Sequence, residues 1–175
     1  SPKLGEVDFG ASSHLDINRL ALRWFDCLLK DLDTGILDEP PVTLFVMGIN
    51  EWRYENEWPL ARTRFTEYYL HSRGRASSDP DDGWLSVEPP GVEPPDRYVY
   101  DPEDPVPTLG GLNLCPPIGP RDVRSVESRP DVLSFTTAPL EAPVAIAGNV
   151  RVRLWASSSA KDTDFTAMLC DVYPD

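Results

Sequence analysis

Serine and histidine are the side chains of this sequence that could carry out nucleophilic chemistry. A serine hydroxyl becomes a strong nucleophile when a histidine accepts its proton and a carboxylate orients that histidine. Such a serine commonly lies on a sharp turn with the pattern G-x-S-x-G, which this sequence does not contain. Consecutive serines occur at positions 157–159, in SSSAKDTDF, which we interpret as a turn whose hydroxyls bond nearby backbone groups. The sequence therefore predicts no nucleophilic serine in the chain.

Acidic and aromatic residues are the other candidates for a site. Asp162, Asp164 and Asp171 offer the oxygen ligands that calcium prefers, but a full loop of ligands is missing, and we interpret the segment as a turn with solvated acids. Three tryptophans could stack on a sugar, yet aromatic residues near prolines at a junction more often pack between domains: Trp52, Trp58 and Trp84. We therefore expect no metal and no cofactor.

Charge and composition exclude several classes of partner. The chain has 175 residues and a formal net charge of −13 without any basic run, so we expect neither nucleic acid nor a membrane surface as a partner. No apolar run approaches the roughly 20 residues that cross a membrane, and no signal peptide is visible, so we expect a cytoplasmic protein. The three cysteines are widely spaced and give neither a disulfide framework nor a metal site.

A helix and a strand are predicted in the first part of the chain. Asp16 can cap a helix that runs to about Leu32. Apolar residues at i, i+3 and i+4 spacing predict one broad buried stripe on this helix: Ile17, Leu20, Ala21, Trp24, Phe25, Leu28, Leu29 and Leu32. The apolar run Val42–Met47 then predicts a strand covered on both faces, followed by an aromatic-anchored turn.

Short strands dominate the predicted second part. Residues 65–71 form one strand candidate, and the Ser/Gly/Asp/Pro-rich segment after it marks a domain boundary. Further apolar pieces recur between turn signals, at residues 84–86, 97–100, 132–136, 144–146, 150–157 and 164–172. Many short strands with proline-rich turns are typical of a β-sandwich.

Four segments resemble the cocaine-esterase / X-Pro dipeptidyl-peptidase family of serine hydrolases, the CocE/NonD hydrolases, in the family's own order. They are VTLFVMGINEWRYENEWPLARTRFTEYYL at 42–70, YVYDPEDPVPTLGG at 98–111, GPRDVRSVESRPDVLSFTTAPL at 119–140 and VRVRLWASSSAKDTDFTAMLCDVYPD at 150–175. The strings YDPEDPVPTLGG and SSSAKDTDF are specific and ungapped, and together the matches cover most of the chain.

The resemblance implies a C-terminal-half fragment, incomplete at both ends. Residues 1–73 would be the end of an α/β-hydrolase domain, residues 74–83 a linker, and residues 84–175 the first part of a mainly-β, galactose-binding-like jelly-roll sandwich. The parent would cleave acyl esters, amino-acid esters or X-Pro dipeptidyl bonds of a small-molecule ester or peptide substrate. Its Ser-Asp-His triad would lie upstream of Ser1, so we expect the fragment alone to be inactive.

Both histidines are assigned to other roles by the same resemblance. The family's catalytic histidine precedes the segment matching VDFGASSHLD, so His14 is expected to be exposed or near the helix cap, and His71 to be structural or exposed. The alternative is a non-catalytic galactose-binding-like module that binds carbohydrate or a partner protein. The amphipathic helix and the strand Val42–Met47 favour the hydrolase, because a free-standing sandwich of that kind does not need them.

A short loop with apolar residues supplies the candidate substrate pocket. Two glycines at 110–111 and two prolines at 116–117 bound Leu112, Leu114 and Cys115, which need a partner surface, either the sandwich end or a ligand pocket. In the resembling family the equivalent loop reaches the hydrolase domain and helps to wall the acyl pocket. Cys115 stands where a close relative has a bulkier residue, which implies more room for the acyl group.

Overall fold

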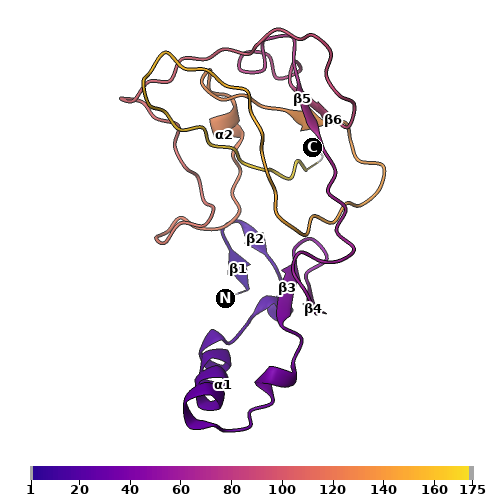
Figure 1. Ribbon diagram of the computed structural model, residues 1–175. Coiled ribbons are helices and arrows are strands. Elements are labelled where there is room, and N and C mark those ends of the chain that lie inside the picture. The colour runs from indigo at the N-terminus through magenta and orange to yellow at the C-terminus, as the bar shows by residue number, and fades with distance from the viewer. Residues whose placement is uncertain (1, 174–175) are drawn as a thin grey trace.

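Small sheets, rather than one large one, organise the chain in the computed structural model, which describes residues 2–173 (Figure 1). Two antiparallel hairpins come first: β1 (Lys3–Leu4) with β2 (Val7–Asp8), and β3 (Val42–Val46) with β4 (Glu51–Glu55). In the third sheet, β6 (Trp84–Ser86) lies antiparallel to β5 (Tyr69–His71) and parallel to β7 (Thr136–Thr137). The helical elements are η1 (Ala11–Ser13), α1 (Ile17–Lys30), η2 (Ile36–Asp38) and α2 (Arg124–Glu127).

Helix α1 begins where the sequence predicts. The Asp16 carboxylate accepts a hydrogen bond from the Arg19 N–H at 3.0 Å, as an N-cap residue does. The predicted burial of its apolar stripe is wrong within the described residues, because no side chain of α1 is buried and Leu29 is 75% exposed. The stripe lacks a covering element at this end of the molecule (Figure 1). Within residues 2–173, no helix has the length and apolar character that a membrane span requires.

The β3–β4 hairpin confirms one predicted strand and corrects the next segment. Strand β3 is half-buried rather than covered on both faces, because its partner is a single strand. The Phe45 ring lies edge-on between Phe9 and Trp52, with centroids 6.0 and 5.1 Å away. The predicted aromatic turn contains β4 instead, since Trp52 pairs across the hairpin and its indole N–H donates to the Ser12 carbonyl at 2.7 Å.

The C-terminal part differs most from the predicted strands. Residues 97–100, 144–146, 150–157 and 164–172 form no ladder, and every side chain from 150 to 172 is exposed. An extended segment becomes a strand only when a neighbour takes up its backbone hydrogen bonds, and no such neighbour lies beside these segments in residues 2–173. The described part of the chain is thus mostly short strands and coil, without a closed barrel or an α/β-hydrolase sheet.

Candidate functional site

The predicted pocket loop is closed at its base by two glycines. Gly111 and Gly119 exchange both backbone hydrogen bonds, each 2.9 Å long. Both residues have positive φ, 76° and 82°, a conformation that side chains with a Cβ adopt at a cost. The Asn113 amide donates to the Gly110 carbonyl at 2.7 Å and ties the start of the loop to its base. We refer to residues 111–119 as the apolar loop.

The tip of the apolar loop points its side chains into solvent. Leu112 is 105% exposed, Leu114 is 102% exposed, and Cys115 is exposed as a free thiol. Within the described residues these side chains therefore do not plug the end of a sandwich. A loop whose base is fixed by hydrogen bonds and whose tip carries exposed apolar side chains is suited to packing against another apolar surface. The substrate role of the three residues remains a prediction.

A second cluster surrounds His71, which is buried at the end of β5. Its Nδ1 lies 2.7 Å from the Glu93 carboxylate, and its ring stacks on Trp84 with centroids 5.1 Å apart. The hydrogen bond with His71, assisted by one from the Ser72 N–H, holds the pKa of Glu93 below its ordinary value. The expectation that His71 is structural is consistent with this packing, but Glu93 lies 22 residues away and was not predicted as its partner.

Ser86, His71 and Glu93 resemble a hydrolytic triad at first sight, because the Ser86 hydroxyl lies 3.1 Å from His71 Nε2. However, the carbonyl oxygen of Glu88 lies 3.0 Å from the same Nε2. A carbonyl can only accept, so Nε2 carries the hydrogen and has no lone pair free for the serine proton. The Glu93 carboxylate lies at Nδ1 and the Glu88 carbonyl at Nε2, so both ring nitrogens face acceptors, and His71 acts as a clamp rather than as a general base.

Asp82 anchors the segment that was predicted as a linker. It is 1% exposed, and its Oδ2 accepts from the N–H groups of Arg73 and Arg75 at 3.0 and 2.8 Å. Asp96 accepts from the Ser72 hydroxyl and from the Ala76 N–H, at 2.6 and 2.9 Å. These bonds make residues 72–83 a closed polar turn, which the sequence signalled only as a loop.

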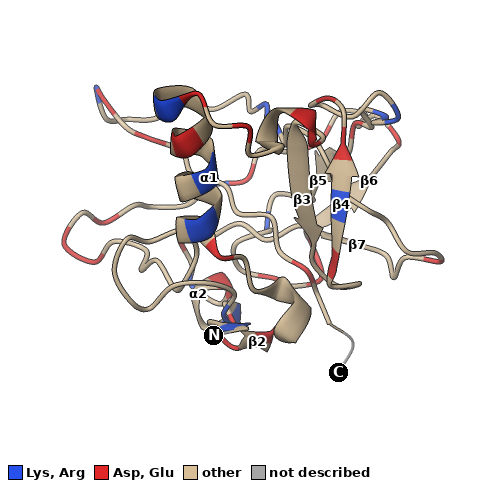
Figure 2. Cartoon of the chain, turned by 90° about the horizontal axis from the view of Figure 1, so that it is seen from below, with Lys and Arg blue, Asp and Glu red and all other residues tan. Residues whose placement is uncertain are grey.

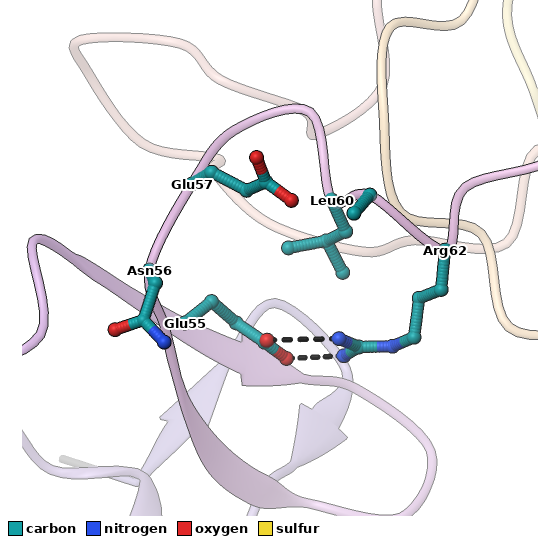
Figure 3. Close-up of a pocket in the computed structure, with 6 residues that line it drawn as sticks. Glu55, Asn56, Glu57, Leu60 and Arg62 are labelled. Atoms are coloured by element: carbon teal, nitrogen blue, oxygen red, sulfur yellow. Dashed lines mark hydrogen bonds and ion pairs between the residues drawn. The ribbon is translucent and has the colours of Figure 1, made fainter.

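A cavity of about 210 Å³ lies beside the turn after β4 (Figure 3). Arg62 forms a bidentate ion pair with Glu55, with one hydrogen bond of 2.9 Å, and this pair lowers the pKa of Glu55. Leu60 forms one wall, and Glu57 extends its carboxylate from the other side (Figure 3). The ion pair occupies Glu55 and Arg62, and Glu57 is the remaining charged group of the lining. The lining contains no serine, cysteine or histidine, so the cavity does not contain a Ser-His-acid arrangement.

The remaining predicted residues are not brought together. His14 is exposed and lies just before α1. Asp162, Asp164 and Asp171 are exposed, and residues 2–173 contain no group of three or more side chains arranged to hold a metal. Trp84 stacks on His71 and Trp52 packs on Phe45, so these two do not form an open sugar platform. Acidic residues are spread over many loops along the chain (Figure 2).

Comparison with known proteins decides the family. Residues 34–175 match the X-Pro dipeptidyl-peptidase C-terminal non-catalytic domain. The chain belongs to this family. The PepX-type domain match includes the apolar loop, the His71 cluster and the C-terminal segments described above. It is consistent with the absence of a catalytic constellation in the described residues.

The chain also matches parts of longer proteins that are named as esterases. The chain is 47% identical over 154 residues to the cocaine esterase of Rhodococcus sp. (strain MB1 Bresler), which covers 87% of this chain and 27% of that protein. It is 30% identical over 158 residues to candidate serine esterases of Mycobacterium bovis and Mycobacterium tuberculosis, covering 87% of this chain and 23% of each. The chain thus spans about a quarter of the length of these relatives, and it belongs to the CocE/NonD-type hydrolases.

Proposed function

We propose that the chain is the pocket-completing part of a serine hydrolase that cleaves acyl esters, amino-acid esters or X-Pro dipeptidyl bonds. The Ser-Asp-His triad would lie upstream, and residues 1–73 would pack against the α/β-hydrolase domain that contains it. Residues 84–175 would begin a galactose-binding-like jelly roll. The substrate would be a small-molecule ester or peptide, the enzyme would be cytoplasmic, and the 175-residue chain alone would be inactive.

The apolar loop is the observation that carries this proposal. Two fully exposed leucines on a loop with a hydrogen-bonded base favour contact with another apolar surface, such as the wall of an acyl pocket. The exposed stripe of α1 supports the same assembly, because it requires a covering surface of similar character. The carbohydrate-binding alternative gains no support from the packed tryptophans Trp52 and Trp84.

The test compares acyl preference in the full-length protein that contains this chain. Leu114→Ala and Cys115→Phe should change kcat/KM for aromatic relative to short acyl esters, because a buried methylene or two shifts discrimination by about 1–3 kcal/mol. Val92→Ala is a matched control, since Val92 is also fully exposed in a proline-rich loop. Equal changes for all substrates, or none, would remove the apolar loop from the pocket.

A further inference from the structure

The β1–β2 hairpin is bonded to the base of the apolar loop, although more than a hundred residues separate them in sequence. The Glu6 N–H donates to the Pro120 carbonyl at 2.9 Å. The Glu6 carboxylate accepts from the Asp122 N–H at 3.0 Å and from the Arg121 guanidinium at 3.4 Å. Glu6 therefore holds the exit of the loop with both its backbone and its side chain. The β1–β2 hairpin that carries it is labelled in Figure 1.

Glycines let these backbones approach more closely than other residues would allow. A Cβ on Gly5 would lie 2.2 Å from the Pro120 carbonyl oxygen, and a Cβ on Gly119 would lie 2.6 Å from Leu4 Cγ. A Cβ on Gly110 would lie 2.2 Å from the Gly119 oxygen and 2.6 Å from Arg121 Cγ. The hairpin, the entrance and the exit of the loop thus meet in one tight junction, which a single added methyl group would force apart.

Within the described residues, the support at the tip of the apolar loop is the Asn113 amide, which donates to the Gly110 and Pro117 carbonyls at 2.7 and 3.4 Å. Leu112 and Leu114 are fully exposed, so their position in space is determined by the junction below them. We propose that the β1–β2 hairpin positions the apolar loop, with Glu6 as the positioning residue, and so determines acyl preference through Leu114. The part of this inference that concerns acyl preference rests on the proposed function, whereas the mechanical part does not.

A nitroxide spin label on Cys115 tests the mechanical part in the full-length protein, with Cys27 and Cys170 changed to Ser. We expect Glu6→Ala to increase label mobility, and Glu6→Gln to increase it less, because Gln keeps an acceptor for the Asp122 N–H. Glu39→Ala is the matched control, since Glu39 forms a similarly exposed ion pair with Arg23 elsewhere. Unchanged mobility in Glu6→Ala would overturn the inference whether or not the protein is a hydrolase.

A glycine pair gives a second variant that does not depend on charge. Gly5→Ala and Gly10→Ala both place a side chain at positive φ, 61° and 78°, but only Gly5 faces a backbone atom, and the space around Gly10 is open. Gly5→Ala should therefore release the label on Cys115, and Gly10→Ala should not. Equal effects would show that backbone strain, and not the junction, controls the loop, and would overturn the inference.

The acyl preference of the same protein tests the functional part. Glu6→Ala should change the ratio of kcat/KM for aromatic and short acyl esters by about two- to tenfold. In the Leu114→Ala background it should change the ratio little further, because Glu6 acts through that side chain. Additive effects would overturn the route through Leu114. A third outcome separates the two parts. If Glu6→Ala makes the Cys115 label more mobile, but neither Glu6→Ala nor Leu114→Ala changes acyl preference, the proposed function is overturned and the mechanical part is supported.

Discussion

Two segments of similar length contrast most clearly in this molecule: residues 69–97, around His71, and residues 144–172 near the C-terminus. The first is held by side chains that bond backbone and one another, including Asp82, Glu93 and Asp96. The second is rich in apolar residues but is exposed from 150 onward and forms no ladder within residues 2–173. The more polar segment is therefore the better organised of the two.

The difference lies in where the bonding partners are found. In the 69–97 segment the side chains of His71, Ser72 and Asp82 find partners within about 25 residues, and β6 adds a pairing with the distant strand β7. In the 144–172 segment apolar and polar residues alternate in part, a pattern that suits a strand with one buried face. A strand also needs a neighbouring strand to take up its backbone hydrogen bonds. Local polar bonding thus organises a segment that apolar patterning alone does not.

The largest effect should follow from removing the Asp82 carboxylate. Asp82→Ala leaves the N–H groups of Arg73 and Arg75 without this acceptor, at a cost of about 2 kcal/mol or more for two part-buried donors. We expect the protection of these amides against hydrogen exchange to fall about 30-fold or more. Asp81→Ala, at the exposed neighbouring position, is the control. Retained protection in Asp82→Ala would contradict the idea that polar bonds organise this segment.

A smaller effect should follow from loosening the His71 clamp. His71→Gln keeps one donor but not both, so we expect the Ser72 amide to lose protection by roughly tenfold, as for one charged hydrogen bond. His14→Gln, at an exposed site, should have no effect.

The clamp also predicts a pH dependence with a definite sign. The pKa of Glu93 is lowered from its ordinary value of 4.5, so its contribution to stability is present above that value and is lost as the pH falls through the folded-state pKa. We expect protection of the Ser72 amide, corrected for intrinsic exchange, to fall below pH 4.5 in the wild type and to be pH-independent in Glu93→Gln. Glu88→Gln, whose carbonyl still faces His71, is the control. A wild-type profile that matches Glu93→Gln would contradict the assignment.

Much of the local structure was predictable from short-range signals. Asp16 caps α1, and the apolar run Val42–Met47 forms β3 nearly throughout, because capping and strand propensity are properties of a few adjacent residues. The burial of the α1 stripe was not predictable in the same way, because periodicity shows which face is apolar and not what covers it. The strands expected in 144–172 fail for the same reason.

In the candidate site, too, the features set by adjacent residues were predictable and those set by distant contacts were not. The glycines and prolines around Leu114 correctly indicated a tight loop, since those residues restrict the backbone locally. Its junction with Glu6 could not be predicted from the sequence, because the side-chain contacts join residues 115 and 116 positions apart. Gly5 is the sequence feature that relates to this junction, since its backbone lies against Pro120. In the sequence, however, a glycine at this position is explained by a hairpin turn alone.

Helix α1 is intermediate between the two segments: its N-terminus is capped by Asp16, but its apolar face is exposed within the described residues. We expect the isolated 175-residue chain to self-associate through this face, because large exposed apolar patches favour contact in water. Leu29→Lys should weaken the association about tenfold, as the loss of one well-buried leucine would. Leu140→Lys, at a similarly exposed site away from α1, is the control for light scattering on a size-exclusion column. A monodisperse wild-type monomer would contradict this expectation.

The smallest effect concerns the contact of the C-terminal segment with α2. Partial desolvation, followed by the negative charge of Glu127 in α2 and a hydrogen bond to it, raises the pKa of the Cys170 thiol. A raised thiol pKa lowers the thiolate fraction at a given pH and slows alkylation. Glu127→Gln should therefore speed the alkylation of Cys170 at pH 8 by about two- to threefold, within the range that loss of one neighbouring charge produces.

The comparison of cysteines makes this last measurement specific. Cys115 lies on the apolar loop, and its alkylation in the same sample should not respond to Glu127→Gln, because within residues 2–173 it is an exposed thiol of that loop and not a neighbour of Glu127. Iodoacetamide labelling followed by mass spectrometry measures both rates at once. If Cys170 is also indifferent to Glu127, the 164–172 segment is not held beside α2 in solution. The contrast between the two segments would then be sharper than in the structure, since polar bonding would order residues 69–97 while residues 164–172 would keep no fixed neighbour.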